Sequence, residues 1–166
     1  AVLDEVGERR LEHRVRGTVI DAFGIGPDRV VTVPHGMPPV VVPTIDERAA
    51  VARRFGLADR PYVLYPAITH PHKRHALLVA MLRSLAEHGD RDTALVLIGG
   101  LGTAEADVQR AIAETGVADR VVRPGRVSDH DRDALLAGAT ALVFPSEYEG
   151  FGAPVIEAML LGTPVV

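Results

Sequence analysis

The sequence contains no cysteine, so it can form neither a disulfide framework nor a thiolate metal site. It also has no apolar run of about 18 residues, the length that a membrane-spanning helix needs, and no signal-peptide pattern. We therefore expect a soluble, cytoplasmic protein without a membrane span. The 166 residues are enough for one sizeable hydrophobic core, and this length predicts a single domain.

Lysine is nearly absent, and acidic residues outnumber basic ones, 22 to 18. The formal net charge is −4, which argues against a surface that binds nucleic acid. The basic residues are arginines with one exception, Lys73, which is the only lysine of the chain. Because lysine is so rare here, its position is informative.

Predicted strands and helices alternate along the chain. Strands are predicted at 29–33, 62–65, 94–98, 120–122 and 141–144, and helices at 3–22, 44–55, 72–87, 103–114, 128–137 and 154–161. Thr44 with Glu47 forms a capping-box pattern, and Ser128 with Asp131 predicts a second helix cap. Strands separated by single helices indicate an α/β fold with a doubly wound parallel sheet, in which ligands bind beyond the carboxyl ends of the strands.

The last 26 residues carry the most informative pattern. A buried strand, 141–144, is followed by an acidic, glycine-rich loop, and Pro154 and Gly162 then delimit a helix. Glu149 lies in the loop, and Glu157 is predicted in the first turn of the helix, with seven residues between the two. Such a helix N-terminus directs backbone N–H groups and a positive dipole towards a phosphate-bearing ligand.

These residues resemble the E-x7-E signature of retaining glycosyltransferases of the GT-B fold, in the family that includes sucrose synthases. Pro145-Ser146, Glu149-Gly150-Phe151-Gly152 and Glu157-Ala158-Met159 all follow the family pattern. The resemblance implies that Glu149 holds hydroxyls of a donor sugar and that Glu157 binds the ribose of the nucleotide. It also implies that Gly150, Phe151 and Gly152 contribute to donor binding.

The segment from Pro66 to His75 resembles a second element of the same family. Its Pro71-His72-Lys73 sequence matches a variant found among bacterial glycosyltransferases, many of them mannosyltransferases. The resemblance implies that Lys73, predicted in the first turn of a helix, supplies positive charge to the donor diphosphate as a catalytic residue. The family arginine is missing from this segment. His72 is a candidate donor contact, although a hydrogen-bonding role in the loop is an equally good interpretation.

Two further strand ends offer candidate donor contacts. Gly99 and Gly100 permit close approach of a ligand to the backbone, but such glycines also occur in plain turns. Arg126 and Val127 lie in a segment that resembles the family loop whose backbone reads the nucleobase. A plain connection between strand and helix is the alternative there.

No metal site is expected. The triplet Asp131-Arg132-Asp133 matches the D-x-D pattern that holds a divalent metal in GT-A enzymes, but here it falls in a first helical turn, where acidic residues are expected on dipole grounds. The three histidines at 70, 72 and 75 have no cysteine or carboxylate to complete a zinc ligand set.

The resemblance implies the C-terminal, donor-binding half of a GT-B enzyme. We expect residues 1–39 to form the end of a preceding region and the interdomain connection, as a helix and a strand followed by Pro34 to Pro39. Residues 40–166 are expected to form a Rossmann-like nucleotide-sugar-binding domain, truncated at its C-terminus.

The expected activity is transfer of a hexose from a nucleotide-diphospho sugar, without a cofactor, to a saccharide or lipid-linked acceptor bound through an N-terminal domain. The Pro-His-Lys variant favours GDP-mannose, and a UDP-sugar such as UDP-glucose is the alternative donor. A peripheral position at the inner membrane stays open for the full-length enzyme. A GT-B-fold UDP-sugar epimerase and a non-catalytic nucleotide-sugar-binding fragment are the other interpretations.

Overall fold

The computed structural model describes residues 5–33, 36, 37, 39–58 and 60–166. The chain divides into two compact units, Ala1–Pro38 and Pro39–Val166. In the part of the chain that is described, no helix is both long and apolar enough to cross a membrane.

The first unit contains the helix α1 (Glu5–Phe23) and the short 3-10 helix η1 (Pro27–Arg29). The predicted helix at 3–22 is confirmed from Glu5 onward, and its first residues lie outside the described part. Arg16 donates hydrogen bonds to the backbone carbonyls of Pro27 and Val30, which folds the turn back onto α1.

The predicted strand at 29–33 is wrong. Arg29 ends η1, and residues 30–33 have no strand partner among the described residues. Val31 and Val33 are 80% and 83% exposed, so the apolar pattern that suggested a strand is not buried against another element. Three residues of the predicted connection from Pro34 to Pro39, namely Pro34, His35 and Pro38, lie outside the described residues.

The second unit is built on a four-stranded sheet. Its strands are β1 (Tyr62–Pro66), β2 (Ala94–Ile98), β3 (Val121–Gly125) and β4 (Ala141–Leu142), in the order β3-β2-β1-β4. All three pairings are parallel, and Val165 adds an isolated parallel bridge to Leu142. The predicted doubly wound parallel sheet is therefore confirmed.

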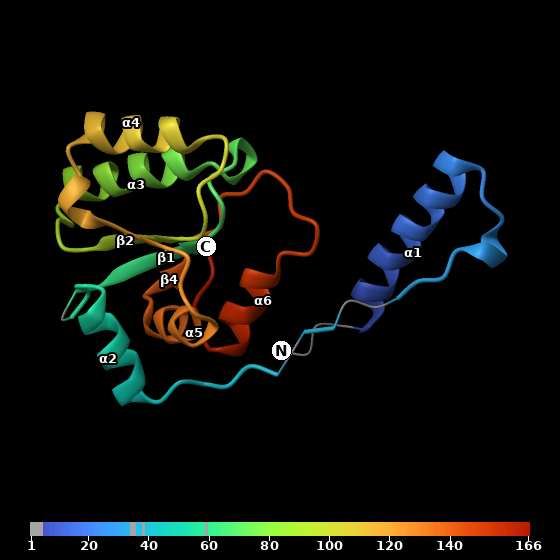
Figure 1. The fold of residues 1–166 in the computed structure, drawn as a ribbon, viewed down its shortest axis with the longest axis horizontal. Coiled ribbons are helices and arrows are strands. Elements are labelled where there is room, and N and C mark those ends of the chain that lie inside the picture. The colour runs from blue at the N-terminus through green and yellow to red at the C-terminus, as the bar shows by residue number, and fades with distance from the viewer. Residues whose placement is uncertain (1–4, 34–35, 38, 59) are drawn as a thin grey trace. The chain divides into compact units, whose positions relative to one another are not determined.

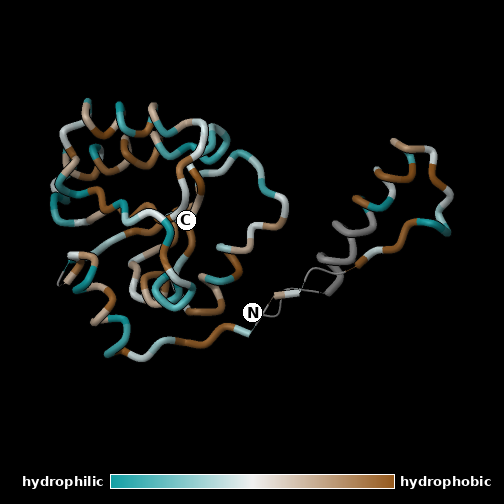
Figure 2. Tube along the Cα trace, viewed as in Figure 1, coloured by the Kyte–Doolittle hydropathy of each residue, from teal (hydrophilic) through white to brown (hydrophobic). Residues whose placement is uncertain are grey.

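Helices cover both faces of this sheet (Figure 1). On one face lie α3 (His75–Glu87) and α4 (Glu105–Thr115), and on the other lie α2 (Ile45–Arg54), α5 (Asp129–Gly138) and α6 (Ala153–Leu160). Helices α3 and α4 alternate between apolar and polar residues, as expected of helices with one buried face (Figure 2).

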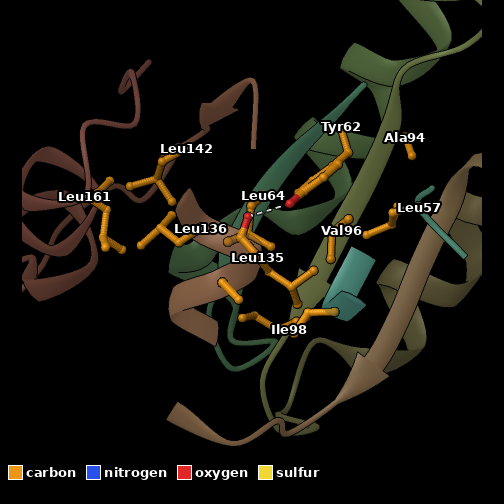
Figure 3. Packing of buried hydrophobic residues seen from close by; sticks show 13 residues of the cluster. Leu57, Tyr62, Leu64, Ala94, Val96, Ile98, Leu135, Leu136, Leu142 and Leu161 are labelled. Atoms are coloured by element: carbon orange, nitrogen blue, oxygen red, sulfur yellow. Dashed lines mark hydrogen bonds between the residues drawn. The ribbon is translucent and has the colours of Figure 1, made fainter. Parts of the chain in front are cut away.

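Alternate residues of the strands enter two separate hydrophobic clusters. Val63 and Tyr65 of β1 pack towards α3 and α4, with Leu78, Leu82 and Val108. Tyr62 and Leu64 pack into the other cluster, where the Tyr62 hydroxyl donates to the carbonyl of Leu135 at 2.7 Å (Figure 3). Burial of both sheet faces explains why the strands read as continuous apolar runs.

Local signals fix most of the helix ends. Thr44 and Glu47 form the predicted capping box at the start of α2, and the Ser128 hydroxyl accepts from the N–H of Asp131 at the start of α5. The helix predicted from His72 is instead broken. A 3-10 turn, η2 (Pro71–Lys73), ends at Arg74, whose φ of 53° is left-handed, and α3 starts only at His75.

Candidate functional site

Four loops meet at the carboxyl edge of the sheet, one after each strand. This is the edge at which ligands of open parallel sheets bind. The loops contain all of the predicted site residues except Glu157, which lies on α6 (Figure 1).

The two predicted catalytic residues, Lys73 and Glu149, are in direct contact. The Lys73 Nζ atom lies 2.5 Å from Oε1 and 2.6 Å from Oε2 of Glu149, although the two residues are 76 positions apart in sequence. Their side chains are 18% and 23% exposed, so the pair is partly shielded from solvent. Lys73 ends η2 and does not lie in the first turn of α3, as the sequence had suggested, because the left-handed Arg74 separates the two elements.

Glu149 is held as a carboxylate. Burial opposes its ionisation, but hydrogen bonds from Lys73 and from the Ser146 hydroxyl outweigh this effect and keep its pKa below the ordinary value. Ser146 is itself 2.6 Å from the hydroxyl of Tyr65, whose pKa is raised to about 12 by burial. The carboxylate thus has partners from the loops after β1 and β4 and, through Ser146, from β1 itself.

The loop around Glu149 is fastened to η2. The N–H of Glu147 donates to the carbonyl of His72 at 2.9 Å, and the His72 ring stacks on Tyr148 with centroids 4.5 Å apart. His72 therefore contacts the loop through its backbone carbonyl and through its ring. Gly152 is the left-handed N-cap of α6, with a φ of 75° that favours glycine, and Phe151 is half-buried beside it.

Glu157 lies one residue further into its helix than predicted, which places it just past the first turn. Because α6 begins at Ala153, Glu157 is its fifth residue, and the first turn contains no acidic side chain. Its side chain is 15% exposed, and its Oε1 lies 3.8 Å from Nη2 of Arg132. Arg132 also pairs with Asp129 at 3.0 Å and with Asp133 at 2.8 Å.

A pocket of about 270 Å³ gathers four of the predicted donor-binding residues, together with Arg132. Its walls include Gly99, Gly100, Arg126, Val127, Asp129 and Arg132. A Cβ atom on Gly99 would lie 2.4 Å from the carbonyl oxygen of Ala67, so this glycine is needed for close packing within the protein itself. Gly100, in contrast, faces the guanidinium of Arg126.

A second pocket, of about 210 Å³, also has Gly99 and Gly100 among its lining residues. Arg123 donates to both oxygens of Glu105 there, at 2.9 and 2.7 Å, and these bonds lower the pKa of Glu105 to about 2. Thr69 donates to the same carboxylate at 3.1 Å. The group ties β3, α4 and the loop after β1 together.

Sequence reasoning missed Arg132, Glu105, Arg123 and Tyr65. Arg132 was considered only as the middle of the acidic triplet, and its contact with Glu157 depends on how α5 and α6 pack. Glu105 and Arg123 lie 18 positions apart on different elements, so no local pattern pairs them. Tyr65 was identified only as the last residue of the predicted strand at 62–65.

The two aspartates of the D-x-D triplet are already engaged. The Asp131 carboxylate pairs with Arg54, and Asp133 accepts from Arg132. Within the described ranges, no group of three or more histidine, aspartate or glutamate side chains is arranged to hold a metal ion. Asp131 lies in the first turn of α5, as predicted, whereas Asp133 lies beyond that turn because α5 starts at Asp129.

Residues 48–166 match the family described as glycosyl transferases group 1. The chain is 34% identical to an O-antigen chain mannosyltransferase B of Escherichia coli over 153 residues, covering 91% of this chain and 40% of the relative. It is 33% identical to a 2-deoxystreptamine glucosyltransferase of Streptomyces kanamyceticus over 156 residues, covering 92% and 36% of the two chains. The chain thus spans about two fifths or less of the length of these relatives.

Among solved structures, the fold is similar to that of Anabaena HepE, which was crystallised with UDP and glucose. The TM-score is 0.65 at 23% identity, covering 74% of this chain and 33% of that one. The described sheet corresponds to one Rossmann-like half of the GT-B fold. With the family match covering most of its length, the chain belongs to the group 1 family of glycosyltransferases.

Proposed function

We propose that this chain is the donor-binding half of a retaining glycosyltransferase that uses a nucleotide-diphospho sugar. The contact between Lys73 and Glu149 carries the proposal. It joins the only lysine of the chain to the first glutamate of the E-x7-E pattern, at the sheet edge where ligands of this fold bind.

Each residue of the site has a proposed role. When the bond between sugar and diphosphate breaks, negative charge remains on the departing phosphate, and Lys73 and the N-terminus of α6 stabilise it electrostatically. Glu149 holds hydroxyls of the donor sugar. Glu157 accepts hydrogen bonds from the ribose hydroxyls, because a carboxylate can accept two in a fork. The proposed reaction keeps the anomeric configuration of the donor and needs no metal ion.

The chemistry of the pocket favours a guanine base. Asp129 offers a carboxylate acceptor, and Arg126 and Arg132 offer donors, around the same space of about 270 Å³. Guanine presents two neighbouring donors and two neighbouring acceptors on its edges, which suits such a mixed set of charges. Together with the Pro-His-Lys variant, this supports GDP-mannose as the donor. A UDP-sugar such as UDP-glucose is the second candidate.

A thermal-shift series with GDP-mannose, UDP-glucose and ADP-glucose tests the donor assignment. A ligand present at 100 times its Kd adds about 2.7 kcal/mol of stability, which gives a clear upward shift of Tm. We expect the largest shift with GDP-mannose, and we expect Asp129→Asn to reduce that shift more than the shift with UDP-glucose. No shift with any of the three nucleotide sugars would contradict the proposed function.

Product analysis with the full-length protein tests the reaction. We expect a hexose transferred to a saccharide or lipid-linked acceptor, with a product of the same anomeric configuration as the donor. Because the matched relatives are more than twice as long as this chain, acceptor contacts are proposed to come from residues outside it. Formation of an epimerised nucleotide sugar would replace this proposal with an epimerase. Binding without turnover would leave a nucleotide-sugar-binding protein.

A further inference from the structure

Tyr65 occupies an unusual position at the end of β1. Its side chain is fully buried, yet its hydroxyl reaches Ser146 Oγ, 2.6 Å away, at the start of the loop that carries Glu149. The ring of Tyr65 packs against His75, with centroids 5.0 Å apart, and edge-to-face against Phe144 at 5.8 Å. These two contacts fix the direction in which the hydroxyl points.

The direction of the hydrogen bonds follows from the chemistry of the groups. An ionised Glu149 can only accept, so Ser146 must donate its hydroxyl proton to that carboxylate. The oxygen of Ser146 is then free to accept from the hydroxyl of Tyr65. With a pKa of about 12, Tyr65 keeps the proton that it donates throughout the neutral range. The result is an ordered chain from Tyr65 through Ser146 to Glu149.

This chain becomes more important when a donor binds. In the structure, Lys73 contacts both oxygens of Glu149, at 2.5 and 2.6 Å. The proposed function requires the Lys73 ammonium to interact with the diphosphate as well, which loosens its hold on the carboxylate. Ser146 would then be the contact that keeps Glu149 in place.

We propose that Tyr65 is a positioning residue that acts through Ser146 to hold Glu149 towards the donor sugar. The inference depends on the proposed function, since it assumes that Glu149 binds the sugar. Tyr65 itself touches no reacting atom. It sets the position of the carboxylate, so its loss should affect recognition of the sugar and leave recognition of the nucleotide unchanged.

A matched control exists on the same strand. Tyr62 is also buried, and its hydroxyl also makes one hydrogen bond, at 2.7 Å, but to the carbonyl of Leu135 on the opposite face of the sheet (Figure 3). Tyr62→Phe and Tyr65→Phe therefore remove the same group from equally buried positions. Both should lower Tm by a similar amount, and only Tyr65→Phe should change the site.

The test measures the Kd of GDP-mannose and of GDP by calorimetry, or of UDP-glucose and UDP if the protein prefers uridine. We expect Tyr65→Phe and Ser146→Ala each to weaken binding of the nucleotide sugar by roughly five- to tenfold relative to the diphosphate. Tyr62→Phe should leave this ratio unchanged. The double variant should be no weaker than Ser146→Ala alone, because both changes break one chain.

Other outcomes would overturn the inference. The inference fails if Tyr65→Phe leaves the ratio of the two Kd values, nucleotide sugar to diphosphate, as it is in the unmodified protein. It also fails if the effects of Tyr65→Phe and Ser146→Ala add in the double variant. Glu149→Gln separates this failure from failure of the proposed function. If Glu149→Gln weakens binding of the nucleotide sugar and Tyr65→Phe does not, Glu149 keeps its role and only the positioning by Tyr65 is lost. If Glu149→Gln does not change the Kd of the nucleotide sugar, the proposed role of Glu149 is wrong, and the inference about Tyr65 is wrong with it.

Discussion

Lys73 shows how much one side chain can reveal in this sequence. Its rarity marked it as a candidate, and the structure places its ammonium on Glu149. The predicted helical turn around it was wrong, because Arg74 adopts a left-handed conformation that nothing in the sequence announces. Such a conformation costs a residue other than glycine roughly 1–2 kcal/mol. Propensity reasoning therefore assigns the segment to the following helix.

The proposed role of Lys73 predicts a selective defect. Lys73→Ala removes a point charge that should contact the diphosphate, and losing a hydrogen bond to a charged group costs about 1.5–3 kcal/mol. We expect binding of GDP or UDP to weaken by at least about tenfold, while the corresponding nucleoside binds as before. Calorimetry with both ligands measures this difference.

Arg83→Ala is the control for that experiment, because it removes an exposed cation from α3, where Arg83 pairs only with Glu87 in the described structure. It should leave both affinities unchanged. If Lys73→Ala weakened nucleoside and nucleotide equally, the lysine would act through the fold and its phosphate role would have to be abandoned.

At the scale of elements, caps were predictable and long-range pairs were not. The capping box of α2 and the Ser128 cap of α5 follow from residues three positions apart, and both were predicted. The pairing of Glu105 on α4 with Arg123 on β3 depends on how the helix packs against the sheet, which no local sequence pattern specifies. Glu157 lies one residue further into α6 than predicted, because the helix starts at Ala153 and not at Pro154.

The Glu105 pair makes a prediction about acid stability. Because hydrogen bonds from Arg123 lower the pKa of Glu105 from 4.5 to about 2, the pair stabilises the folded state fully above about pH 4.5. This contribution is lost as the pH falls from there through about 2. Glu105→Gln should therefore lower the free energy of unfolding at pH 7 and flatten its decline below pH 4.5. Urea unfolding at several pH values measures both effects.

Glu87→Gln is the matched comparison, since Glu87 forms an exposed pair with Arg83 and should change stability little. If the free energy of unfolding of Glu105→Gln fell below pH 4.5 as steeply as that of the unmodified protein, the Glu105–Arg123 pair would not stabilise the fold as inferred.

At the scale of the whole molecule, alternation of strands and helices was sufficient to predict the parallel sheet, and the candidate site residues follow its strands at the carboxyl edge. The predicted strand at 29–33 failed because an apolar run becomes a strand only when a partner is available. No partner pairs with it among the described residues. The pocket next to Arg126 was also partly predictable, because it is made from consecutive strand ends.

We further predict that nucleotide binding is independent of Mg²⁺ and Mn²⁺. The positive field is proposed to come from Lys73 and the N-terminus of α6, while both aspartates of the D-x-D triplet are used in ion pairs. Titration of GDP or UDP in EDTA should give the same Kd as titration with Mg²⁺ present. A loss of binding in EDTA that Mg²⁺ restores would reopen the metal interpretation of Asp131 and Asp133.

The most direct test of nucleotide binding at this edge is calorimetric titration of GDP and UDP into Glu157→Ala, next to the unmodified protein and Glu114→Ala. Glu114 is an exposed glutamate of α4, away from the site, and its change should leave affinity as it is. Loss of a forked carboxylate acceptor at Glu157 should weaken binding of the preferred nucleotide by about 1.5–3 kcal/mol, or roughly ten- to 150-fold, with Tm close to that of the unmodified protein. Unchanged affinity of Glu157→Ala for both nucleotides would contradict the account.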